Sequence, residues 1–69
     1  MNAALSMKIL ALEFSSSQRA VAVAESENVL ATVATDNLKN SPLTLIDEAL
    51  QKARLDRGTI EVIALGIGP

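Results

Sequence analysis

Residues 7–17 read MKILALEFSSS, and this stretch gives the first indication of the fold. Positions 9–12 are apolar at every step, whereas a strand with one wet face alternates apolar and polar residues. The run therefore predicts a central strand, at residues 8–14, that is covered on both faces. It ends in Glu13, Phe14 and three serines. A buried strand that delivers a carboxylate and a serine-rich turn to its carboxyl end is a common setting for a ligand site.

The composition restricts the classes of function. The 69 residues contain no Cys and no His, so the sequence offers no disulfide, no thiolate metal site and no imidazole base. Phe14 is the only aromatic residue, and six basic residues stand against eight acidic ones, for a net charge of −2. Direct nucleic-acid binding usually needs a basic stripe or stacking aromatic side chains, so it is not expected.

The length predicts at most one small domain. We expect residues 1–6 to form a disordered leader and residues 7–69 a single partial domain, because a chain this short buries only ~60% of its unfolded surface. No apolar run approaches the ~20 residues of a membrane span, so no membrane association is expected. The absence of Cys is compatible with a cytoplasmic location.

Two further strands are predicted at residues 19–24 (RAVAVA) and 29–34 (VLATVA), with Thr32 as the exposed position of the latter. Polar turns separate the three strands. Asn28 tolerates a positive φ, so the second link is expected to be a tight hairpin. Three short strands joined by tight links favour an antiparallel meander.

A helix is predicted at residues 42–54. Ser41 is a suitable N-cap, and Pro42 occupies the first helical position, where its missing N–H costs nothing. Gly58 marks the exit from the helix. The apolar positions recur at helical spacing as a stripe of Leu43, Ile46, Leu50 and Ala53, widened by Leu45 and Ala49.

The fourth strand is predicted at residues 59–67 (TIEVIALGI). Because it follows a helix, we expect it to lie parallel to an earlier strand after a right-handed crossover. The predicted fold is therefore α/β with the order βββαβ. Four consecutive apolar residues at 62–65 favour cover on both faces, but only one helix is present to supply it. The chain thus reads as the first half of a larger α/β domain, whose missing cover comes from further chain, from a second copy or not at all.

The candidate ligand-binding residues lie at the ends of the first and fourth strands. The acid there is either a ligand to metal or phosphate, or a solvated strand end, and the serines either bind phosphate or only form the turn. No second carboxylate and no base accompany them in the sequence, so neither a catalytic residue nor a metal site is predicted. The set comprises Glu13, Ser15, Ser16, Ser17, Gly66 and Gly68.

Three segments together resemble the N-terminal part of the TsaB (YeaZ) family, which is related to the actin-like ATPases. MKILALEFSSS is similar to the family's opening strand, Ile-Leu-Ala-Ile-Asp-Thr-Ser-Thr. LTLIDEALQKARL is similar to its first helix, Leu-Leu-Pro-x-Ile-Asp-x-Leu-Leu-x-x-Ala. IEVIALGIGP is similar to the strand Leu-Asp-Ala-Ile-Ala-Val-Gly-x-Gly-Pro, which leads into a Gly-Ser-Phe-Thr-Gly loop. The resemblance covers residues 7–69 and about the first third of a typical member.

The resemblance implies a fold and a role. It implies half of an actin-like ATPase (ribonuclease H-like) domain. It also implies a non-catalytic subunit that supports threonylcarbamoyladenosine formation on tRNA by dimerising with a TsaD-like paralogue. ATP or ADP with Mg²⁺ would be bound only through that partner or through further chain. Glu13 replaces the family's usual Asp with a side chain that is one methylene longer, and Phe14 replaces its usual Thr and removes a hydroxyl donor. The contact would use the apolar helix residues Leu43, Leu45, Ile46, Ala49, Leu50 and Ala53.

Two alternatives remain open on the residues alone. The chain is an actin-like nucleotide-binding half-domain that uses Glu13 and the turn at residues 15–17 on a metal–phosphate group, or it is a small self-associating domain without activity. Loss of nucleotide affinity on replacing Ser15 and Ser16 with Ala would favour the first, and a stable homodimer that ignores paralogue and nucleotide would favour the second.

Overall fold

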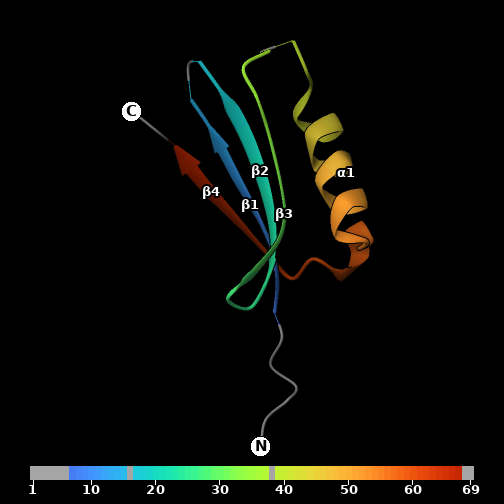
Figure 1. Ribbon diagram of the computed structural model, residues 1–69. Helices are drawn as coiled ribbons and strands as arrows, with labels where there is room; N and C mark the ends of the chain where they lie inside the picture. Colours follow the sequence, from blue (N-terminus) through green and yellow to red (C-terminus); the bar gives the residue numbers. More distant parts are fainter. Residues whose placement is uncertain (1–6, 16, 38, 68–69) are drawn as a thin grey trace, which may run out of the picture.

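The computed structural model describes residues 7–15, 17–37 and 39–67, and its elements follow the predicted order (Figure 1). The expected leader at residues 1–6, together with Ser16 and Gly68, lies outside the described residues. The elements are β1 (Lys8–Phe14), β2 (Arg19–Glu25), β3 (Asn28–Thr35), α1 (Pro42–Ala53), the short 3₁₀ helix η1 (Arg57–Thr59) and β4 (Val62–Ile67).

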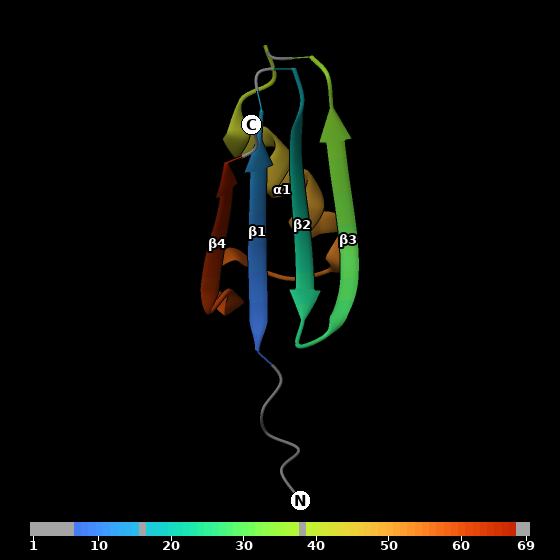
Figure 2. The ribbon, with the colours of Figure 1, turned by 90° about the vertical axis from the view of Figure 1, so that its left-hand side faces the viewer.

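The four strands form one mixed sheet in the order β3-β2-β1-β4 (Figure 2). β1, β2 and β3 are an antiparallel meander, and β4 lies parallel to β1 with Ile9 opposite Val62. The predicted α/β class and the parallel return of the last strand are therefore confirmed. The strand rich in consecutive apolar residues, β1, lies in the interior of the sheet, as its sequence predicted.

Helix α1 covers one face of the sheet, above β2 and β3 (Figure 1). The core lies between them, because alternate strand residues and one side of the helix point into the same layer. Each fully buried aliphatic side chain in such a layer stabilises the fold by about 1.5–3 kcal/mol. The core residues are Leu10, Val21, Val23 and Val33 from the sheet, with Leu45, Ala49 and Leu50 from the helix.

No element among the described residues covers the opposite face of the sheet (Figure 2). Side chains alternate between the faces of a strand, so the neighbours of the core residues point to this side. Cover on both faces was predicted, and the described residues supply it on one. The open face comprises Ile9, Ala11, Ala20, Ala22, Ala24, Thr32, Ala34, Val62 and Ala64, and Thr32 is exposed as expected.

The start of the helix matches the sequence, and its end differs. Ser41 Oγ accepts a hydrogen bond from the Thr44 backbone N–H at 3.1 Å, and Pro42 occupies the first turn. The helix ends at Ala53, and Arg54 forms the C-cap in the left-handed region, with φ 60° and ψ 42°. The exit is thus made by a non-glycine residue, and Gly58 belongs instead to η1.

Strand β4 begins three residues later than predicted. Thr59 ends η1, because its N–H and its hydroxyl both donate to the Asp56 carbonyl, at 3.0 and 2.7 Å. Glu61 then ties the chain to the start of β1. Its N–H donates to the Lys8 carbonyl at 2.9 Å, and its carboxylate accepts from the Lys8 N–H at 3.1 Å. The polar residues at the front of the predicted strand therefore close a turn before pairing begins.

The hairpin between β2 and β3 is tight, as predicted, but the residue with a positive φ is Ser26 and not Asn28. Glu25 pairs with Asn28, which leaves two residues in the loop. The positive φ of 56° falls on Ser26, whereas Asn28 begins β3. A hairpin loop of two residues requires φ > 0 at its first central position in both preferred turn types, and this position is Ser26.

Candidate functional site

The carboxyl ends of β1 and β4 meet at one end of the sheet because the two strands are parallel. Glu13 is the Cα partner of Gly66 there. A Cβ added at Gly66 would lie 3.9 Å from both Cγ and Oε2 of Glu13, so the carboxylate lies over the glycine. The structure therefore brings together two of the predicted ligand-binding residues from segments 53 positions apart in the chain.

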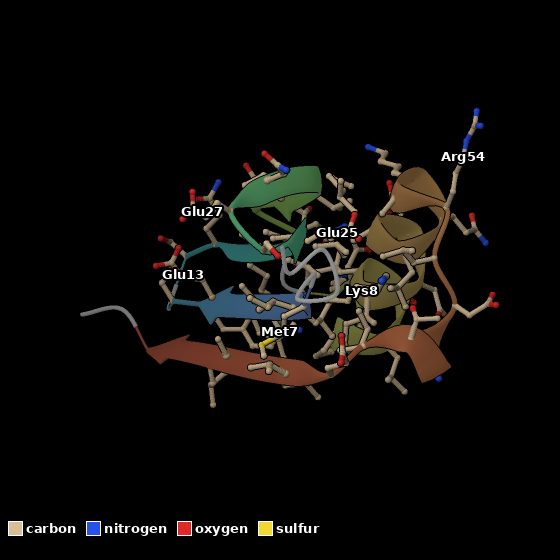
Figure 3. All side chains as sticks on the ribbon, turned by 90° about the horizontal axis from the view of Figure 1, so that it is seen from below. Met7, Lys8, Glu13, Glu25, Glu27 and Arg54 are labelled. Carbon is tan, nitrogen blue, oxygen red and sulfur yellow. The ribbon has the colours of Figure 1, made fainter. Side chains whose placement is uncertain are left out.

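Glu13 is exposed and points away from α1 (Figure 3). In the described part of the chain, no group of three His, Cys, Asp or Glu residues is placed to hold a metal ion. A single solvated carboxylate binds a cation weakly, because metal sites combine several oxygen ligands. The described residues at this end of the sheet thus offer one acid and no second acid beside it.

Two residues of the predicted serine cluster, Ser15 and Ser17, are described, and both lie in the β1–β2 turn. Ser15 Oγ accepts from the Gln18 N–H at 3.0 Å and from the Ser17 N–H at 3.4 Å, and it donates to the Gln18 carbonyl at 3.1 Å. The Ser15 N–H also donates to that carbonyl, at 2.8 Å. The Ser15 hydroxyl is therefore occupied in closing the turn, while the Ser17 side chain is exposed.

Phe14 is half-buried and packs against the core on the helix side of the sheet. The Arg19 guanidinium lies 5.6 Å from the centre of its ring, and its Nη1 donates to the Asn40 carbonyl at 2.9 Å. Arg19 thereby joins the start of β2 to the segment that leads into α1. Sequence reasoning missed this role, although the register of the predicted hairpin, which places Arg19 opposite Phe14, was a usable signal.

A groove lies on the helix side of the sheet, between α1 and β4. It exists because α1 lies above β2 and β3 and leaves β4 bare on that side. The groove has a volume of about 200 Å³ and an almost wholly apolar wall. Its lining, called here the helix–β4 groove, comprises Leu10, Leu43, Ile46, Leu50, Arg57, Ile60 and Ile63.

The six helix residues expected at an interface divide into two groups. Leu45, Ala49 and Leu50 are buried against the sheet, and Ile46 and Ala53 are partly buried and packed on the same core. Leu43 is 61% exposed. The helix therefore offers Leu43, with the edges of Ile46 and Leu50, to the groove. Sequence periodicity alone missed Ile60 and Ile63, which come from the segment after the helix.

An ion pair between Arg57 and Asp47 lies at the rim of the helix–β4 groove. Arg57 Nε donates to Asp47 Oδ1 at 2.9 Å, and Nη2 donates to the same oxygen. Both side chains are more than half exposed, so the pair contributes little to stability by itself. Its effect is positional, because it links η1 to α1 and holds Arg57 at the rim.

Comparison of the sequence with models of known protein families gives no match, and comparison with curated proteins gives none either. Among the described residues, no helix is both long and apolar enough to cross a membrane.

Proposed function

We propose that this chain is a non-catalytic partner subunit, similar to the N-terminal part of TsaB. In this proposal it acts in the cytoplasm and supports threonylcarbamoyladenosine modification of tRNA by dimerising with a TsaD-like paralogue. The observation that carries the proposal is the helix–β4 groove. It exposes Leu43 of α1 and Ile63 of β4, at 61% and 65%, on a wall whose other lining residues, apart from Arg57, are apolar.

The groove favours association because exposed large apolar side chains gain free energy when a partner removes them from water. Apolar grooves beside a helix commonly accept an amphipathic helix of a partner. Arg57 at the rim adds a polar boundary, as is usual around the apolar centre of an interface. The carboxyl end of β1 supports the non-catalytic part of the proposal. There the Ser15 hydroxyl is hydrogen-bonded within its turn, and the Glu13 carboxylate is solvated.

The test mixes the purified chain with the TsaD-like protein of the same genome and measures binding by calorimetry. Leu43→Asp places a charge in the groove, so we expect affinity to fall at least tenfold. Thr44→Asp is the matched control, because Thr44 is exposed on the same turn and does not line the groove. No binding by the unaltered chain, or equal binding by both variants, would refute the proposal.

A second candidate function, nucleotide binding, is favoured by one observation. Glu13 and Gly66 lie at the carboxyl ends of a parallel strand pair, where α/β sheets usually bind ligands. In this reading Glu13 holds Mg²⁺ of a nucleotide. Titration with Mg-ATP would show binding that Glu13→Gln weakens and that Glu27→Gln, an equal charge change in the β2–β3 turn, leaves intact. The absence of any measurable binding would exclude it.

A further inference from the structure

Within the described residues, the outer edge of β4 has no neighbouring strand. The strand order places β4 at one end of the sheet, and none of the described residues pairs with its outer side (Figure 2). Proteins usually protect such edges with charged side chains, Pro, or a bulge. Val62–Ile67 contains no charged residue and no Pro, and its pairing with β1 is continuous. The edge therefore carries none of these protective features.

The free backbone groups of this edge can be assigned. The Ser26 N–H donates to the Met7 carbonyl on the β2 side, whereas Lys8 exchanges bonds with Glu61 on the β4 side. Backbone groups of successive strand residues point to opposite sides, so Leu10 also faces β4.

Leu10 is opposite Ile63, and in a parallel pair it bonds to the residues on either side of its partner. These residues are Val62 and Ala64. The N–H and C=O groups of Ile63 and Leu65 consequently point outward, away from β1.

The other edge of the sheet is less suited to pairing. β3 is flanked by α1, which packs against it. Its register with β2 also shifts between Val23 and Ala24, so one residue of β3 is inserted there. Such an irregularity twists the strand and interrupts the line of hydrogen-bonding groups. The two edges therefore differ, and the continuous one is β4.

We propose that β4 pairs antiparallel with β4 of a second copy of this chain, about a two-fold axis near Ala64. Ile63 then lies opposite Leu65 of the partner subunit, and each uses its outward N–H and C=O. The two sheets join into one of eight strands, with both helices on the same side. This inference does not depend on the proposed function, which uses the helix–β4 groove.

A second copy fits the edge for reasons of register and charge. In this register the exposed Ile63 and Leu65, at 65% and 63%, meet apolar partners across the axis. A shift of two residues toward the amino end of β4 would set Leu65 opposite the carboxylate of Glu61. The strand is uncharged and the whole chain carries only −2, so two copies repel one another little.

The expected dimer is weak, because the contact is small. An edge of six residues is about 20 Å long, and pairing along it buries less than the ~1,600 Å² of a standard interface. We therefore expect a monomer–dimer equilibrium that depends on protein concentration over the micromolar to millimolar range. A fixed dimer at all concentrations would need a larger surface than this one.

The test combines sedimentation with amide hydrogen exchange of the full chain. We expect the dimer fraction to rise with concentration, and protection of the Ile63 and Leu65 amides to rise with it at least tenfold. The amides of Val62 and Ala64 bond to β1 and should be protected at every concentration. A monomer at all concentrations, or a dimer in which the Ile63 and Leu65 amides stay unprotected, overturns the proposal.

Substitutions distinguish dimerisation through the β4 edge from dimerisation through the helix–β4 groove. Leu65→Pro removes an outward N–H without removing a bond to β1, so a folded monomer is expected. Leu65→Val keeps the N–H and is expected to dimerise. A Leu65→Pro chain that still dimerises overturns the proposal. So does loss of the dimer in Leu43→Asp, because the groove would then be the contact. If the Pro variant fails to fold, the concentration dependence of Ile63 and Leu65 amide protection in the unaltered chain still tests the proposed pairing.

Discussion

Leu43 and Leu45 lie two positions apart on α1 and face opposite environments. Leu45 is 1% exposed and belongs to the core, whereas Leu43 is 61% exposed. The change from Leu to Ala removes the equivalent of about three methylene groups, worth ~2.4 kcal/mol at ~0.8 kcal/mol each when they are fully buried. The cavity left at Leu45 raises its total cost to ~2–5 kcal/mol. At Leu43 the loss scales with its smaller burial and leaves no cavity, so we expect ~1 kcal/mol or less.

Urea unfolding of the two Ala variants, followed by far-ultraviolet circular dichroism, measures these costs. Circular dichroism is the appropriate signal because the chain has no Trp and no Tyr. A chain of this length has a stability of roughly 3.5–10 kcal/mol, so Leu45→Ala removes a large fraction of it. Its midpoint should fall by about 1 M or more, at a slope of 1–2 kcal/mol/M. Midpoints that differ by less than the error of the two curves would refute the assignment of Leu45 to the core and of Leu43 to the groove.

Three further changes test the ends of the helix and its link to η1. Ser41→Ala removes the cap on the Thr44 N–H and should cost ~0.5–2 kcal/mol in thermal unfolding, whereas Ser41→Asp should cost much less; equal losses would contradict the cap. Arg54→Gly should stabilise the chain by ~1 kcal/mol, because Gly accepts a left-handed φ of 60° without strain; a lower melting temperature would contradict this. Asp47→Asn breaks the exposed pair with Arg57 and should cost under ~1 kcal/mol, with a loss that shrinks in high salt; a salt-independent loss would argue against an ionic contribution.

Sequence reasoning predicted the fold well because its signals were local and strong. The uninterrupted apolar run in β1 indicated an interior strand, and Ser41 with Pro42 fixed the start of α1. The ends were harder to place. Arg54 rather than a glycine takes the left-handed C-cap, and Thr59 closes η1 instead of opening β4. In both cases backbone hydrogen bonds available only in the folded chain outweighed residue preference.

The candidate site was predicted less completely. The position of Glu13 directly after the apolar run placed it at the carboxyl end of β1, and the parallel return of β4 brought Gly66 beside it. The helical period could not separate Leu43 from Leu45, because it gives an apolar stripe and not the lateral position of the helix above the sheet. That position, over β2 and β3, exposes Ile63 and creates the groove. It depends on packing between segments distant in sequence.

The register of β1 with β4 has a consequence for the order of folding. Ile9 pairs with Val62, so β1 is synthesised well before its parallel partner. The β1–β2–β3 meander closes only short loops, whereas the β1–β4 pair must close a loop that contains β2, β3 and α1, at a higher entropic cost. During synthesis the meander can therefore form while one side of β1 is still open. Slow arrival of β4 would leave that side available to chaperones or to other nascent chains.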